Sequence, residues 1–454
     1  MEAIRKLSKG LKLRYGIGDF GVAVITASLQ FYMLLYYTDV VKIDPGIAGT
    51  AMLVGKLTWD MVNDVLFGYI SDRTKSRWGR RRPYLMFCPI PLALSFWLLY
   101  SLPQGMSNVT AFFAIIGSFV LFDTFHTMIT MAYQSMSAEL TTDYNERTSL
   151  ATVRMVFSVI GYISGAALTT LLASILRDNT GISDAAAWSK VGLIFGVLAA
   201  ITVLITGLTV REKPVVDDTP TKMPPLPALV STLKNKPFMH FVIIFSIMST
   251  AFTVVTAMLP YYVIYQLNME SSMSIIMMLM LVVLGLFLVP CQMVAMRIGK
   301  HKAYALGLTI ACAALFVSFF LPHRETALIY AIAAIAGLGF SSQWVCPHSM
   351  MPDVIEYDEL VTHERREGIY FGMWNMTGKV TGALGIAICG WGLKLFGYVE
   401  GAEQTATSLL GIRLMFSVLP VALLLVSVLL LMRYPISKET HAKVLEELNK
   451  RKQM

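Results

Sequence analysis

Residues 191–208 read VGLIFGVLAAITVLITGL and carry no charged side chain. A helix of about 20 apolar residues crosses the roughly 30 Å hydrocarbon core of a membrane. This stretch therefore predicts a transmembrane helix, which we place at 188–210. Runs of similar length and polarity precede and follow it along the whole chain.

We expect twelve such helices in two groups of six, so the predicted fold class is an all-α polytopic membrane protein. The chain is 56% hydrophobic and only 15% charged, whereas a soluble domain has about 25% charged residues. This composition excludes an ordinary water-soluble fold. The expected spans are 15–38, 46–71, 84–102, 109–138, 149–175 and 188–210, and then 238–265, 270–296, 302–321, 326–352, 368–396 and 408–434.

A stretch rich in proline and charge, residues 211–237, separates the two groups of spans. Such a composition cannot bury enough apolar surface to fold alone. We therefore predict four parts of the chain, and the last of them is a charged amphipathic helix at the membrane surface. The parts are an N-terminal six-helix half (1–210), a cytoplasmic linker (211–237), a C-terminal six-helix half (238–434) and a cytoplasmic tail helix (435–454).

Basic residues cluster after the second, eighth and tenth expected spans, at 73–82, 297–302 and 365–366. Because cytoplasmic loops are enriched in lysine and arginine, this pattern predicts that both termini are cytoplasmic, in the cell (inner) membrane. The same enrichment explains the net charge of +8, so nucleic acid is not an expected partner. The basic turns after spans two and eight correspond to each other, which indicates two parallel repeats.

The second expected span carries charges that a membrane disfavours. Lys56, Asp60 and Asp64 follow one another at four-residue spacing and share one face of an α-helix. An ionised acid at the bilayer centre costs about 3 kcal/mol, so these acids need a monovalent cation, a proton, Lys56 or Lys379 of span eleven as a partner. Asn63 adds a neutral oxygen. We interpret Asp60, Asn63 and Asp64 as a monovalent-cation site, with a purely structural charge cluster as the alternative.

Other polar side chains inside the expected spans are candidates for substrate binding and coupling. Arg154 offers a planar fork to a hydroxyl-rich or anionic solute, or else forms a salt bridge to Asp19 or Asp123. Asp123 and His126 lie three residues apart and could relay protons, or Asp123 could serve only an interhelical hydrogen bond. Lys379 is a point charge that could exchange partners between states.

Aromatic and small residues add less specific signals. Tyr133 and Trp374 suit a sugar face or a lipid tail, and they suit helix packing equally well. The pair Gly161 and Gly165 predicts close helix approach, as does the pair Gly378 and Gly382. We find no nucleophile or metal constellation of an enzyme and no repeated rings of a channel, and we expect no cofactor other than the coupling cation.

Several longer motifs point to one family. They are 15–19 (YGIGD), 36–40 (YYTDV), 59–64, 72–83, 139–148, 352–358 and 366–368. Together with Lys379 they resemble the glycoside-pentoside-hexuronide:cation symporter family, the melibiose-permease-like branch of the major facilitator superfamily. The resemblance spans nearly the whole chain.

This resemblance implies the major facilitator fold and alternating access. It assigns Asp60 and Asp64 to the cation site, and it matches Lys379 and Arg154 to the family's lysine of helix eleven and arginine of helix five. The implied function is symport of a glycoside or related sugar with sodium or a proton, by a protein that works as a monomer in the bilayer.

Three positions depart from the melibiose-permease branch. Ala23 and Ile129 stand near where that branch has sugar-binding acids, and Tyr133 stands where it has a tryptophan. The alternative function is therefore cation-coupled symport of a lysophospholipid or another amphiphile. A third option is another glycoside or a uronate bound through Arg154 and Trp374. The sequence leaves sodium and proton both open.

Overall fold

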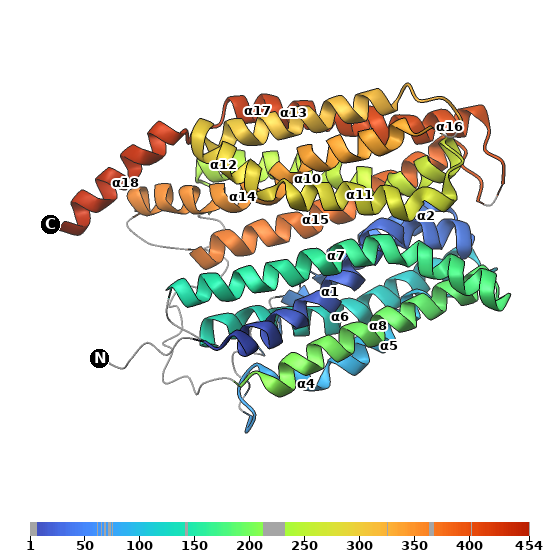
Figure 1. Ribbon diagram of the computed structural model, residues 1–454, viewed down its shortest axis with the longest axis horizontal. Helices are drawn as coiled ribbons and strands as arrows, with labels where there is room; N and C mark the ends of the chain where they lie inside the picture. The colour runs from blue at the N-terminus through green and yellow to red at the C-terminus, as the bar shows by residue number, and fades with distance from the viewer. Residues whose placement is uncertain are drawn as a thin grey trace. The chain divides into compact units, whose positions relative to one another are not determined.

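Every regular element that the computed structural model describes is helical (Figure 1). The structure describes residues 7–60, 62–64, 66–67, 70, 74, 76–140, 144–211, 232–324, 326–362, 367–400 and 402–453. No strand occurs among these residues, and the prediction of an all-α fold is confirmed.

The chain forms two compact units. Unit 1 comprises Met1–Thr219 together with Met273–Met278 and Gly390–Glu403, and unit 2 comprises Pro220–Ser272, Leu279–Cys389 and Gln404–Met454. Two short pieces from the second half of the sequence therefore belong to unit 1. The four-part division expected from the sequence stays a prediction.

Three helices of the first half, α1, α2 and α8, begin at well-formed caps. The side-chain oxygens of Ser8, Asp44 and Ser183 each accept a hydrogen bond from the backbone N–H three residues further on, which stabilises a helix start. The elements are α1 (Lys9–Leu35), η1 (Tyr36–Val40), α2 (Pro45–Gly55), η2 (Lys56–Asp60), α4 (Arg82–Phe87), α5 (Pro89–Leu99), α6 (Asn108–Leu140), α7 (Tyr144–Thr180) and α8 (Asp184–Thr209).

The second half continues with long helices and ends in the expected tail helix, α18. Its elements are α10 (Lys236–Tyr261), η3 (Tyr262–Gln266), η4 (Glu270–Ser272), α11 (Met273–Leu286), α12 (Leu288–Ile298), α13 (Lys300–Ser318), α14 (Leu328–Thr362), α15 (Glu367–Leu395), α16 (Ala406–Arg413), η5 (Leu414–Val418), α17 (Leu419–Met432) and α18 (Lys438–Gln453). Most of them belong to unit 2.

Eight helices of the described chain are long and apolar enough to cross a membrane. A ninth is added if the pair α11 and α12, bent by 42°, forms one span. The polytopic character of the prediction is confirmed, and the count of twelve spans stays a prediction.

Two expected spans are interrupted beside a proline. The span 84–102 is split into α4 and α5, and Pro89 is the first residue of α5. The span 270–296 bends at Phe287, three residues before Pro290. Proline has no N–H, and its ring clashes with the carbonyl four residues earlier, so an α-helix breaks or kinks there.

Helix α1 packs against α7 and α8 within unit 1. At Gly161 and Gly165 the backbone of α7 lies so close to α1 that any side chain would clash, at Gly165 with the carbonyl of Val24. Close helix approach is therefore confirmed at this pair. The prediction is wrong for Gly378 and Gly382, where an added Cβ would have ordinary room.

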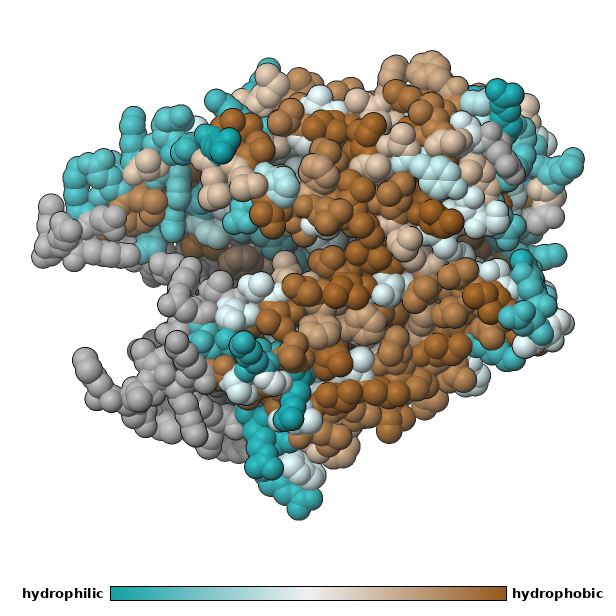
Figure 2. All heavy atoms as spheres, viewed as in Figure 1, coloured by the Kyte–Doolittle hydropathy of each residue, from teal (hydrophilic) through white to brown (hydrophobic). Residues whose placement is uncertain are grey.

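On the face seen in Figure 2, apolar side chains cover much of the surface along the long helices, and polar side chains gather toward the helix ends. On α8 the exposed large apolar residues are Leu193, Ile194, Val197, Ile201 and Leu208. Soluble proteins rarely expose apolar patches of this extent. The surface is that of a helix bundle in contact with lipid.

Some predicted features lie outside the described residues. They include most of the linker, the start of the basic turn at Asp72 and Arg73, Asp143, and the pair Arg365 and Arg366. For Asp60 the backbone is described and the side chain is not.

Candidate cation and substrate site

The second span changes from an α-helix to a π-helical turn just where its charges begin. Helix α2 ends at Gly55, and η2 runs from Lys56 to Asp60. A π-turn closes hydrogen bonds over five residues instead of four and often marks a functional site. The four-residue spacing predicted that Lys56 and Asp60 lie one ordinary α-turn apart. Because the π-turn is wider, they do not.

Two side chains of this span bind helix α6. The indole Nε1 of Trp59 donates to Thr124 Oγ1 at 2.8 Å. The amide Nδ2 of Asn63 donates to Asp123 Oδ2 at 2.8 Å and to the Asp123 main-chain oxygen at 3.1 Å. We call these four residues the Asn63 cluster. It lies in unit 1 and fixes the register of the second span against α6.

The other end of the Asn63 side chain is an oxygen without a donor. Asn63 is fully buried, and no described residue donates a hydrogen bond to its Oδ1. Asp123 is 6% exposed. An amide oxygen beside a carboxylate such as half-buried Asp64 is the kind of ligand that a hard monovalent cation prefers.

Lys56 contacts an aromatic ring of α6. Its Nζ lies 5.6 Å from the centre of the Phe119 ring, within the range of a cation–π interaction. The predicted proton relay involves the same helix. Asp123 binds Asn63, and the His126 ring stacks on Phe122 with centroids 5.3 Å apart. The structure thus shows the interhelical hydrogen bond that was the alternative for Asp123, and the relay stays a prediction.

A second polar cluster joins α1, α6 and α7 in unit 1. Arg154 Nε lies 3.3 Å from Asp19 Oδ2, and the guanidinium carbon is 5.8 Å from the centre of the Tyr133 ring. Tyr133 stacks on Tyr15 with centroids 4.6 Å apart. Each tyrosine hydroxyl donates to the main-chain oxygen of the other. We call these four residues the Arg154 cluster.

The Arg154 cluster contains one of the two arrangements that the sequence left open. The salt bridge to Asp19 is present, and both side chains remain partly accessible, 29% for Arg154 and 15% for Asp19. The guanidinium keeps donors that are not used by this contact, since arginine has five N–H groups. A role in solute binding stays a prediction.

Two of the positions that depart from the melibiose-permease branch, Ala23 and Ile129, are buried. Ala23 is buried on α1 with its Cβ against Gly161 of α7, and Ile129 is buried on α6. An acid at position 23 would force α1 and α7 apart. The apolar residue at 23 is therefore explained by helix packing and says little about the solute.

The predicted site residues of the second half lie on α15 in unit 2. Trp374 is buried. The centre of its ring lies 5.6 Å from the ring centre of Phe241, 5.4 Å from that of Phe245 and 4.7 Å from that of His348. Lys379 is half-buried further along the same helix. Helix packing accounts for Trp374, and the functional roles of both residues stay predictions.

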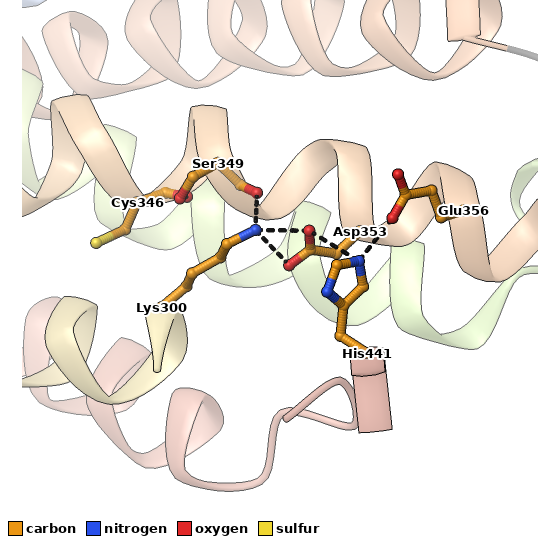
Figure 3. Close-up of polar contacts among 6 residues, drawn as sticks. All are labelled: Lys300, Cys346, Ser349, Asp353, Glu356 and His441. Carbon is orange, nitrogen blue, oxygen red and sulfur yellow. Dashed lines mark hydrogen bonds and ion pairs between the residues drawn. The ribbon is translucent and has the colours of Figure 1, made fainter. Parts of the chain in front are cut away.

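The structure also contains a charge cluster that the sequence did not predict (Figure 3). Lys300 Nζ, at the start of α13, lies 2.6 Å and 2.8 Å from the two carboxylate oxygens of Asp353 on α14. His441 Nε2, on the tail helix α18, lies 2.6 Å from Glu356 Oε2 and 3.4 Å from Asp353 Oδ1. These four residues form the Asp353 cluster of unit 2.

The Asp353 cluster holds its donors and acceptors in mutual contact. Carboxylate and imidazole groups of Asp353, Glu356 and His441 offer ligand atoms within 4.8 Å of one another. An ammonium on both oxygens of Asp353 would repel a metal ion, so we assign the cluster to tail docking. Lys438 strengthens the same contact by donating to the main-chain oxygen of Met296 at 2.9 Å. A hydrogen bond from the Ser437 hydroxyl lowers the pKa of Glu439 at the start of α18.

Comparison with known proteins gives a family match over most of the chain. The family model described as MFS/sugar transport protein matches residues 14–438. This match covers all motifs on which the family resemblance rests. The prediction of a major-facilitator sugar-transporter family is thereby confirmed.

Named proteins are similar over nearly the whole chain. The isoprimeverose transporter of Lactiplantibacillus pentosus is 27% identical over 448 residues, which cover 97% of this chain and 91% of that protein. The sodium-dependent lysophosphatidylcholine symporter 1 of Mus musculus is 26% identical over 468 residues, which cover 96% and 87%. A crystal structure of the nucleoside transporter NupG has a TM-score of 0.64 at 17% identity, covering 92% of this chain and 98% of that one. The last likeness shows the fold alone.

Proposed function

Because the chain belongs to the MFS/sugar transport protein family, we propose that it is a secondary active transporter that couples a cation to an organic solute. Proteins of this family and fold are membrane transporters, so the chain is an integral membrane protein and not an enzyme. We propose symport of a glycoside or a related sugar by alternating access. The coupling cation is sodium, with the proton as the competing choice.

The observation that carries the cation site is the buried oxygen of Asn63. A buried polar atom without a partner costs free energy, and the cost is high inside a membrane span. This oxygen has no donor within the described part of the chain. It lies between Asp60 and Asp64 in the sequence. A monovalent cation bound by these three residues satisfies the oxygen and removes the repulsion between the acids.

Helix α6 offers a physical route for coupling. It carries Asp123 and Thr124, which hold the second span, and further along the same helix it carries Tyr133 of the Arg154 cluster. A shift of α6 on cation binding would therefore move both groups. Lys379 of α15 stays in the proposal as a coupling residue.

The Arg154 cluster supports a sugar as the solute. It combines a guanidinium and a carboxylate that are both partly accessible, and these groups suit the hydroxyls of a sugar. The alternative solute is a lysophospholipid or another amphiphile. The similarity to the sodium-dependent lysophosphatidylcholine symporter supports this alternative.

The test is thermal unfolding of the purified protein with glycosides, uronates and lysolipids, each in sodium and in potassium. We expect a glycoside to stabilise the protein only in sodium. The variant Asp64→Asn should lose the sodium effect, because it removes one charge of the site. Asp184→Asn, at the exposed start of α8, is the matched control and should keep it.

Each other result changes a named part of the proposal. Sodium-dependent stabilisation by a lysolipid selects the amphiphile. Stabilisation that follows pH instead of sodium selects the proton. A sodium effect that survives in both Asp60→Asn and Asp64→Asn removes the cation site.

We also propose that the protein works as a monomer in the cell (inner) membrane with both termini in the cytoplasm. The loop charges support this orientation. In a variant whose five cysteines are replaced by serine or alanine, a cysteine introduced at position 450 should react with a reagent that does not cross membranes only in inverted vesicles.

A further inference from the structure

The amide nitrogen of Asn63 donates two hydrogen bonds to one residue. Its Nδ2 donates to Asp123 Oδ2 at 2.8 Å and to the main-chain oxygen of Asp123 at 3.1 Å. The main-chain oxygen can only accept, since a peptide carbonyl has no hydrogen to give. The orientation of the amide is therefore determined, because the reversed amide would set its oxygen against this carbonyl oxygen.

This orientation sends the amide oxygen the other way. In a planar amide the oxygen and the nitrogen diverge by about 120°, so Oδ1 points away from Asp123. It is the Asn63 atom that is buried without a donor among the described residues. The contact with Asp123 thus selects which end of Asn63 faces the proposed cation.

A neighbouring contact keeps Asp123 in register. Thr124 follows Asp123 on α6, and its hydroxyl accepts from Trp59 at 2.8 Å while donating to the main-chain oxygen of Val120 at 2.7 Å. The hydroxyl is thereby fully oriented. Trp59 and Asn63 lie four residues apart on the second span, so two adjacent residues of α6 hold them both.

We propose that Asp123 is a positioning residue for the cation site: it orients Asn63 so that the amide oxygen binds the cation, without binding the ion itself. The inference rests on the proposed function, because it assumes that Asn63 is a ligand. It adds a residue of another helix, α6, to the machinery of the second span.

Two variants of Asp123 separate positioning from direct ligation. In Asp123→Asn the new side-chain oxygen can still accept from Asn63, so the cation concentration for half-maximal response should change by less than about threefold. In Asp123→Ala the side-chain acceptor is lost, and the concentration should rise about tenfold, as for one hydrogen bond to a charged group. A direct ligand would instead weaken binding in both variants, because both remove the charge.

A double-mutant cycle tests whether Asp123 acts through Asn63. Asn63→Ala removes the amide, so adding Asp123→Ala to it should weaken cation binding no further. Independent effects would add, and the cycle reports the difference directly. The readout is the sodium concentration, or the pH if the proton is the cation, at half-maximal thermal stabilisation of the full-length protein. Asp184→Asn again serves as the control for loss of an acid.

The outcomes are distinguishable. Rescue by Asp123→Asn and a non-additive cycle support the inference. Equal losses in both Asp123 variants, or additive effects in the cycle, overturn it while the cation site survives. Unchanged half-saturation in Asp123→Ala also overturns it and leaves Asp123 a packing residue. If the unmodified protein responds to neither sodium nor pH, the proposed function is wrong, and the inference, which depends on it, is wrong as well.

Discussion

The Asn63 cluster of unit 1 and the Asp353 cluster of unit 2 are both built on long helices. They differ in how far their polar atoms are paired by hydrogen bonds. Around Asp353, the ammonium of Lys300 covers both carboxylate oxygens, and His441 bridges to Glu356. Around Asn63, the amide nitrogen is held by Asp123 and the amide oxygen is buried without a donor in the described part of the chain.

This difference separates a contact that holds the fold from one that is open to a ligand. Buried polar groups are normally hydrogen-bonded, so a closed set of partners needs no ligand to be stable. An acceptor without a donor costs free energy, and a membrane span makes the cost larger. We therefore expect changes in the Asp353 cluster to alter stability, and changes in the Asn63 cluster to alter cation binding.

The largest expected effect is that of Asn63→Leu, which keeps the branch at Cγ and removes both polar ends. The cation loses a ligand, and Asp123 loses its donors. We expect cation affinity to fall about 100-fold, equivalent to roughly 3 kcal/mol. Titration of sodium or pH against thermal stability measures it. Unchanged affinity would show that the buried oxygen of Asn63 has no part in binding.

The next effect is that of Lys300→Met in unit 2. The change leaves the buried carboxylate of Asp353 without its ammonium, and we expect a loss of about 2 kcal/mol of unfolding free energy. The remaining exposure of Lys300, 36%, keeps the loss below that of a fully buried pair. Cation affinity should not change. If the variant were as stable as the parent but bound the cation more weakly, the Asp353 cluster would serve cation binding and not stability.

Arg154→Lys sharpens the comparison within unit 1. Lysine keeps the charge beside Asp19 but loses the planar fork and the contact with the Tyr133 ring. We expect the solute concentration for half-maximal uptake to rise about fivefold, or roughly 1 kcal/mol, with cation affinity unaltered. Uptake assays at saturating sodium measure it. Equal weakening of cation binding and solute binding would instead indicate that the Arg154 cluster is part of the cation site.

The smallest effect is that of His441→Ala. The tail helix loses its bridge to Glu356, at a cost of about 0.5–1 kcal/mol in docking free energy. Limited proteolysis should then cut α18 faster, while transport continues. The control is Lys450→Ala, which removes an exposed pair with Glu446 and should leave the rate of cleavage unaltered. Equal cleavage of parent and His441→Ala would show that the tail is held elsewhere.

Much of the fold could be predicted from the sequence because crossing a membrane is a local requirement. A run such as 191–208 must be helical, since no water is present to hydrogen-bond its backbone. The long apolar helices, the tail helix and the acids of the second span follow from short stretches of sequence. The breaks at Pro89 and Pro290 are also local, because proline disturbs a helix within one turn, but the expected spans 84–102 and 270–296 were continuous and did not include them.

The partners of the polar residues were decided by the tertiary structure. Asn63 and Asp123 are 60 positions apart, and Arg154 and Asp19 are 135 apart. The sequence offered Arg154 two acids and Asn63 no partner at all. Helix packing made both choices: α1 contacts α7 closely at Gly161 and Gly165, and the second span packs against α6.

The sequence by itself therefore determined that this chain is a helical membrane protein with acids in its second span, because hydropathy and helical spacing act over about 20 residues. Only the tertiary structure decided which oxygen of that span lacks a donor, that Ala23 is a packing contact, and that His441 docks on α14. A hydrogen bond needs two groups within about 3 Å, and the distance between two helices cannot be predicted from the sequence of either helix alone.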